Sequence, residues 1–147
     1  MSNWTHLDAE ALYNVAKWGS GYFGINSNGR LSVRPDGRAA NELGEIDLFE
    51  LIGQIRRRGV EPPILLRFNG ILRARVNEIH AAFNAARTEY GYTAPYHCVF
   101  PIKVNQQRQV VEEVLNFGAQ YGFGLEAGSK PELLAVSAMA TNDTPII

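Results

Sequence analysis

A lysine interrupts an apolar run in the middle of the chain. Residues 96–104 read Tyr-His-Cys-Val-Phe-Pro-Ile-Lys-Val, and the polar triplet Asn-Gln-Gln follows at 105–107. Lysine is rarely buried unless its amine is paired or used. A strand over 99–104 places Lys103 near the carboxyl end, where α/β enzymes carry their reactive groups. The run therefore predicts a buried strand that ends in a functional lysine or in one whose amine extends to water.

A second predicted strand, residues 123–127, also carries a charge near its carboxyl end, at Glu126. Carboxyl ends of adjacent parallel strands share one edge of a sheet, so Lys103 and Glu126 form a candidate site. Alternation places Cys98, Phe100, Ile102 and Val104 on one strand face and Lys103 on the other. Amines in such positions form covalent bonds with carbonyl groups, including that of pyridoxal phosphate.

Other polar residues near this edge have ordinary structural explanations as well. Asn105 and its glutamine neighbours line a site or simply begin a helix. Glu132 is explained as the capping-box partner of Ser129. His97 and Cys98 are expected to be structural, and the three histidines and one cysteine show no metal-ligand spacing.

Strands and helices alternate over the second half of the chain. Apolar strands are predicted at 63–68, 99–104, 123–127 and 144–147, separated by helices over about 69–90, 108–118 and 130–140. This order predicts an α/β fold with a parallel sheet. An open doubly wound sheet and the first part of a (β/α)8 barrel both fit the pattern.

The first half of the chain has a different pattern. A helix is predicted over 8–18, then a hairpin over 22–33 that turns at Asn28-Gly29 with both turn residues at positive φ. Residues 19–24 match GxGxxG, but a helix precedes them and a hairpin follows, which argues against a dinucleotide site. A polar loop at 35–45 is a plausible boundary, and Asp47 is predicted to cap a helix that ends at Arg56–Arg58.

Composition excludes several classes of partner. The 147 residues are 46% hydrophobic with a net charge of −1, which argues against a general nucleic-acid or membrane-surface protein. No apolar run approaches a membrane span and no signal peptide is recognisable, so a cytosolic location is expected. Because the last residues resemble the opening of a strand, we expect the chain to be part of a longer protein.

Two motifs resemble one enzyme family. Residues 101–107, Pro-Ile-Lys-Val-Asn-Gln-Gln, resemble the cofactor-lysine strand of biosynthetic arginine decarboxylases, and residues 124–133, Gly-Leu-Glu-Ala-Gly-Ser-Lys-Pro-Glu-Leu, resemble that family's next block. The hairpin segment and the Asp47 helix also resemble its beginning. Phe100 stands where the family usually has tyrosine.

The resemblance implies a fold, an activity and site residues. The fold is the first four strands of a (β/α)8 barrel over 46–147, with residues 1–45 belonging to a second β domain. Lys103 binds pyridoxal phosphate, Glu126 lies near the cofactor, and Asn105 and Glu132 line the site. The activity is decarboxylation of L-arginine to agmatine in polyamine (spermidine) synthesis, by a homo-oligomer that commonly requires magnesium.

Two alternatives stay open at this stage. The substrate could be another basic amino acid, such as ornithine or diaminopimelate. The chain could instead be a non-catalytic regulatory protein that binds a decarboxylase. Because the glycine-rich phosphate cradle of the family is not found in these residues, the 147 residues alone are expected to be inactive. Four strands of an eight-stranded barrel leave open edges and an exposed interior, so the 147 residues are also expected to be poorly soluble.

Overall fold

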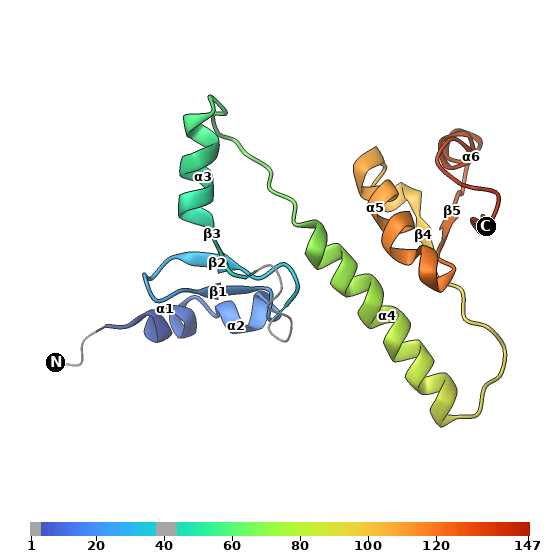
Figure 1. The fold of residues 1–147 in the computed structure, drawn as a ribbon, viewed down its shortest axis with the longest axis horizontal. Helices are drawn as coiled ribbons and strands as arrows, with labels where there is room; N and C mark the ends of the chain where they lie inside the picture. The colour runs from blue at the N-terminus through green and yellow to red at the C-terminus, as the bar shows by residue number, and fades with distance from the viewer. Residues whose placement is uncertain (1–3, 38–43) are drawn as a thin grey trace. The chain divides into compact units, whose positions relative to one another are not determined.

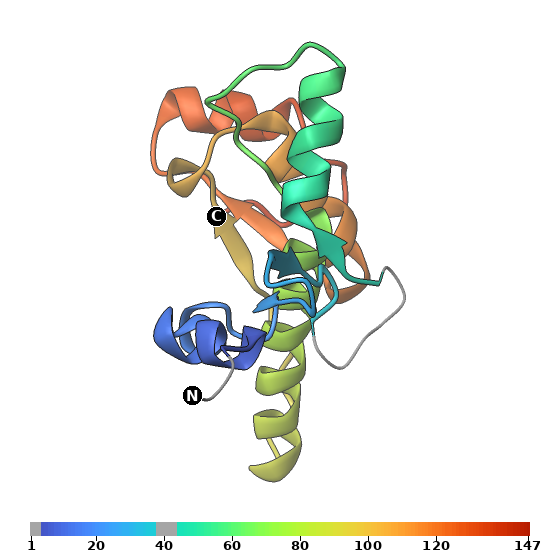
Figure 2. The same cartoon turned by 90° about the vertical axis from the view of Figure 1, so that its left-hand side faces the viewer.

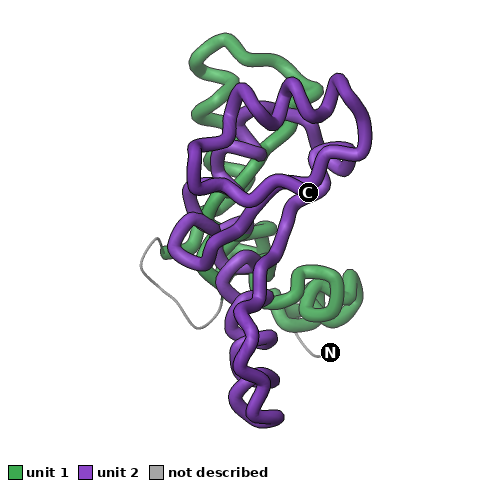
Figure 3. Tube along the Cα trace, turned by 90° about the vertical axis from the view of Figure 1, so that its right-hand side faces the viewer, with its two compact units in different colours: residues 1–71 green, residues 72–147 purple. Residues whose placement is uncertain are grey.

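The computed structural model describes residues 4–37 and 44–147. The chain divides into two compact units, residues 1–71 and 72–147 (Figure 3). Each unit has its own sheet, antiparallel in the first and parallel in the second. Among the described residues, no helix is both long enough and apolar enough to span a lipid bilayer.

The first unit begins with two short helices where one was predicted. Helix α1 spans His6–Leu12 and α2 spans Val15–Trp18. Asn14 between them adopts a left-handed conformation, with φ of 52°, which asparagine tolerates better than most residues. The prediction of a single helix over 8–18 is therefore wrong, because the segment is divided at Asn14.

An antiparallel hairpin follows, as predicted. Strand β1 (Phe23–Ile25) pairs with β2 (Leu31–Val33), and β2 pairs with β3 (Ile46–Asp47). The predicted two-residue turn is wrong, because residues 26–30 form the loop and only Gly29 among them has positive φ. Asn26 explains the longer loop, since its side-chain oxygen accepts from the backbone N–H groups of Asn28 and Arg30.

Helix α3 (Leu48–Arg57) continues directly from β3 (Figure 2). Asp47 caps it as predicted, accepting from the backbone N–H of Glu50 at 3.1 Å. Arg30 on the hairpin loop pairs with both Asp47 and Glu50, at 3.3 and 3.0 Å, and lies over the Phe49 ring. These contacts tie the helix start to the hairpin. The predicted boundary loop at 35–45 lies mostly at 38–43, outside the described residues.

The strand predicted at 63–68 is absent from this structure. These residues form no regular element, and Leu65 is 74% exposed. A strand needs a hydrogen-bonded neighbour, and none of the described residues pairs with this segment. The predicted helix after it is present as α4 (Asn69–Glu89).

In the second unit, β4 (Val99–Pro101) pairs in parallel with β5 (Gly124–Glu126). Residues 145–147 add a third parallel segment beside β5, through a bridge between Leu125 and Ile146 and backbone hydrogen bonds on both sides of it. The three segments therefore lie in chain order, and the predicted strand at 144–147 is present only as this short pairing.

Helices α5 (Arg108–Gly118) and α6 (Lys130–Ser137) connect these segments, with a 3-10 turn, η2 (Ala119–Tyr121), before β5 (Figure 1). One buried cluster joins Ile102 and Leu125 to Val111 of α5 and Val136 of α6. A second joins Val76 of α4 to Val114 and Phe123, with Cys98 and Phe100 packed against it. All three helices therefore cover the sheet face that alternation assigned to Cys98, Phe100 and Ile102.

Candidate active site

Lys103 lies just beyond the end of its strand. The predicted strand over 99–104 is too long, because β4 stops at Pro101 and residues Ile102–Val104 form a one-turn 3-10 helix, η1. Proline has no N–H to continue the ladder. Ile102 is 2% exposed and anchors the turn in the core, whereas the Lys103 side chain is 63% exposed. The amine is therefore held near the sheet edge yet stays accessible.

Glu126 lies beside Lys103, on the neighbouring strand. The register pairs Pro101 with Glu126, and the Lys103 Nζ lies 3.5 Å from the Glu126 Oε1. The structure thus brings together the two residues that the sequence places at the same edge. A pair this exposed stabilises a fold by less than about 1 kcal/mol, so its main physical effect is to orient the amine.

Asn105 shapes the turn that follows the lysine. Its side-chain oxygen accepts from the backbone N–H of Gln107 at 3.0 Å, and α5 begins at the next residue. Gln107 itself gives no side-chain cap to the helix. In this structure Asn105 fixes the backbone between Lys103 and α5.

Glu132 fixes the loop that follows Glu126. Ser129 caps α6 and accepts weakly from the Glu132 backbone N–H at 3.4 Å, with Pro131 in the first turn as predicted. The Glu132 carboxylate accepts from the Gly128 backbone N–H at 2.8 Å. In a capping box it would accept from the backbone N–H of the next residue, Ser129. Asn105 and Glu132 therefore support the two loops behind the Lys103–Glu126 pair.

His97 and Cys98, in the apolar run that precedes Lys103, have structural surroundings. Cys98 packs against the cluster of Val76, Val114 and Phe123. The His97 ring lies against Gly122, where an added Cβ would be 3.4 Å from the His97 Nδ1. Within residues 4–37 and 44–147, no group of three or more His, Cys, Asp or Glu side chains is arranged to hold a metal ion.

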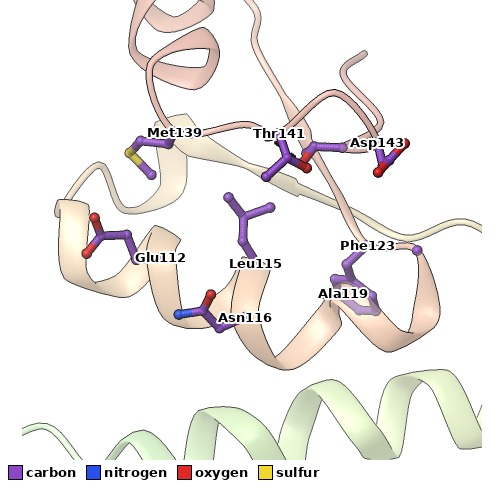
Figure 4. Close-up of a pocket in the computed structure, with 10 residues that line it drawn as sticks. Glu112, Leu115, Asn116, Ala119, Phe123, Met139, Thr141 and Asp143 are labelled. Atoms are coloured by element: carbon purple, nitrogen blue, oxygen red, sulfur yellow. Dashed lines mark hydrogen bonds between the residues drawn. The ribbon is translucent and has the colours of Figure 1, made fainter.

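A hollow of 210 Å³ lies away from the lysine, between α5 and the segment after α6 (Figure 4). Leu115 and Phe123 contribute its apolar part, and Asn116, Thr141 and Asp143 contribute polar groups. Phe123 immediately precedes β5, so this hollow lies at the amino end of that strand. It includes none of the predicted site residues, and we assign it no part in the candidate site.

Comparison with known proteins agrees with the pattern around Lys103. Residues 76–147 match the family model described as pyridoxal-dependent decarboxylase, pyridoxal binding domain. The chain is 48% identical over 146 residues to the biosynthetic arginine decarboxylase of Rhodopirellula baltica, covering 99% of this chain and 21% of that protein. It is 49% identical over 145 residues to the enzyme of the same name from Gloeobacter violaceus, covering 99% and 22%.

A solved structure of an enzyme with the same name is also similar to this chain. The crystal structure of the biosynthetic arginine decarboxylase from Campylobacter jejuni superimposes with a TM-score of 0.79 at 34% identity, over 91% of this chain and 21% of that one. The chain thus spans about a fifth of the length of the relatives it matches. Residues 76–147 are therefore similar to the pyridoxal binding domain of pyridoxal-dependent decarboxylases, and nearly the whole chain is similar to one part of the biosynthetic arginine decarboxylases.

Proposed function

We propose that this chain contributes the cofactor-binding lysine of a pyridoxal phosphate-dependent arginine decarboxylase, which converts L-arginine to agmatine. The observation that carries the proposal is the Lys103–Glu126 pair, 3.5 Å apart at the carboxyl ends of two parallel strands. This pair lies within the residues that match the pyridoxal binding domain. The names of the relatives support arginine as the substrate.

The residues present fit pyridoxal phosphate. The cofactor requires a lysine amine that a carbonyl carbon can reach, and the Lys103 side chain is 63% exposed with a carboxylate beside it. When bound, pyridoxal phosphate supplies the electron sink for the bond that breaks as CO2 leaves. Lys103 holds the cofactor, and Glu126 orients the lysine and balances its charge. Asn105 and Glu132 keep the two supporting loops in place.

We infer that residues 46–147 form the first part of a (β/α)8 barrel. Two features support it: parallel segments that neighbour each other in chain order, and three helices packed on one sheet face. A doubly wound sheet has helices on both faces. The antiparallel sheet of β1, β2 and β3 supports a separate β domain for residues 1–45, to which β3 adds residues 46–47.

Further properties that we expect from the resemblance or, for the location, from the sequence pattern stay proposals. They are homo-oligomeric assembly, a magnesium requirement, a cytosolic location and a place in polyamine synthesis. Ornithine or diaminopimelate as substrate, and a non-catalytic regulatory role, are the alternatives. Decarboxylation assays of the complete enzyme with all three amino acids separate the substrates, and activity with none supports the regulatory role.

The test of the cofactor assignment is chemical labelling. The complete enzyme is incubated with pyridoxal phosphate, reduced with borohydride and digested. We expect the label on the peptide that contains Lys103 and loss of decarboxylation in Lys103→Ala, with little change in the circular dichroism spectrum, since the exposed side chain packs little. Lys130→Ala, a lysine at the start of α6, is the matched control and should keep the label. Labelling of another lysine, with none at Lys103, would refute the assignment.

A further inference from the structure

A second hollow, lined by residues 83–97, lies at the end of α4. It has a volume of 560 Å³, and its walls include Phe83, Arg87, Tyr90, Tyr92, Tyr96 and His97. The segment after α4 runs back to β4 (Figure 1), and its residues Tyr92 and Pro95 to His97 line the hollow. Residues 95–97 directly precede β4, so the hollow lies at the amino end of this strand, whereas Lys103 follows its carboxyl end. It is separate from the candidate active site.

Flat aromatic rings form much of the wall. Phe83 and Tyr96 are stacked, with ring centroids 4.1 Å apart and planes inclined by 11°. Tyr90 and Tyr92 are 80% and 61% exposed, which is high for such large rings. Burial, followed by a hydrogen bond with Cys98, raises the pKa of Tyr96 to about 12, so its phenol is neutral at ordinary pH. This wall offers neutral, planar surface to a planar ligand.

Arg87 brings a positive charge into the same hollow. Its Nη1 donates to the Asn84 side-chain oxygen at 3.4 Å, but its Nε is buried and has no hydrogen-bond partner. No carboxylate among the described residues pairs with it. A cation in the last turn complements the helix dipole, which explains the charge of Arg87. The dipole does not explain a desolvated N–H, because buried polar groups normally have partners.

We propose that this hollow binds a small aromatic carboxylic acid. The ring packs against the aromatic wall, and the carboxylate accepts hydrogen bonds from the Arg87 guanidinium, whose planar fork matches carboxylate geometry. The carboxylate neutralises the charge, and the side chain turns on binding so that the Nε–H, which is covered in this structure, also reaches the carboxylate. This site goes beyond the proposed decarboxylation, since it includes neither Lys103 nor Glu126 and needs no cofactor.

The experiment uses the complete enzyme and phenylacetate as the probe, with phenylacetamide as its neutral analogue. Titrations are followed by isothermal titration calorimetry. We expect saturable binding of phenylacetate, and at least about fivefold weaker binding of the amide, since hydrogen bonds to charged acceptors are about twice as strong as neutral ones. Absence of saturable binding, or equal affinity for the two probes, would overturn the proposal.

Substitutions separate the site from a purely structural role of Arg87. Arg87→Gln should weaken phenylacetate binding by about tenfold or more, because it removes the charge and the fork. Arg87→Lys keeps a charge at the helix end but should also bind more weakly than the wild type. Arg75→Gln, on the same helix but paired with Glu78, should bind like the wild type. Circular dichroism checks folding, and wild-type affinity in both Arg87 variants would show that the guanidinium does not recognise the acid.

Discussion

Lys103 is held differently from Arg75 and Arg108, two other charged residues of the second unit. Its neighbour Ile102 is fixed in the core, while its own amine stays accessible beside Glu126. By contrast, Arg75 and Arg108 pair with acids on their own helices, at Glu78 and Glu112. An amine on a rigid anchor is suited to a defined reaction, whereas a cation on a helix surface mainly adds to solubility and local helix stability.

The Asp47 carboxylate should make the first unit sensitive to acid. Burial alone would raise its pKa, but hydrogen bonds from the Glu50 backbone N–H and from the Asn26 and Arg30 side chains outweigh it and lower the pKa below 3.8. Because the folded-state pKa is below the unfolded value, this stabilisation is complete above the unfolded pKa. It is lost as the pH falls through the folded value.

We expect Asp47→Asn to be less stable than the wild type at about pH 6, with a difference that shrinks towards about pH 3. Both tryptophans, Trp4 and Trp18, belong to the first unit, so tryptophan fluorescence during urea unfolding reports that unit. Asp143→Asn in the second unit is the control and should leave this signal unchanged. A stability difference that is constant over the whole pH range would contradict the role given to the charge of Asp47.

At the scale of elements, Gly124 permits the close pairing of β5 with residues 145–147. A Cβ at this position would collide with the Pro145 carbonyl oxygen, a backbone atom that cannot rotate away. We expect Gly124→Ala to destabilise the second unit by about 1–3 kcal/mol, the usual cost of overpacking. Amide exchange checks this directly, since the Leu125 N–H that donates to Pro145 should lose protection.

Gly53→Ala is the matched control for this substitution. Gly53 lies inside α3, and the nearest atom to an added Cβ is the mobile Arg57 Nη1 at 3.7 Å. Alanine there should stabilise the first unit by about 0.5–1 kcal/mol through helix propensity. Unchanged protection of Leu125 in Gly124→Ala would show that the segment after Gly124 adapts without loss of pairing.

Local signals in the sequence predicted most elements, and pairing partners decided the rest. Asp47 and Ser129 identify the starts of α3 and α6, because a cap is a contact between residues three apart. Residues 63–68 carry an apolar strand pattern, yet a strand also requires a neighbour that no local pattern specifies. The strand predicted over 99–104 was too long, although Pro101, which lacks an N–H, is a sequence signal for the early end of β4.

The meeting of Lys103 and Glu126 was predictable from the order of the strands. Lys103 and Glu126 meet because two successive parallel strands end at one edge, which follows from the strand order alone. The hollow around Arg87 was not predicted. Its only sequence signal is a high density of aromatic residues between positions 83 and 97, and the orphaned Nε appears only in three dimensions.

At the scale of the molecule, the chain spans about a fifth of the length of its relatives, and activity should depend on the remainder. We predict that the purified 147 residues release no CO2 from arginine, because the glycine-rich phosphate cradle of the family is not found in them. Release of labelled CO2 from arginine is the measurement, with the complete enzyme as the positive control. Activity of the 147 residues that Lys103→Ala abolishes would show that the site is complete without the cradle.

The chain-order arrangement of parallel segments in the second unit has a consequence for synthesis on the ribosome. Val99 pairs with Gly124 and Leu125 with Ile146, so each segment joins one made roughly 20 to 25 residues earlier. Among the described residues, both pairings in this sheet join segments that are close in sequence. Each strand therefore meets a partner that has already left the ribosome, and the sheet can grow in the direction of translation.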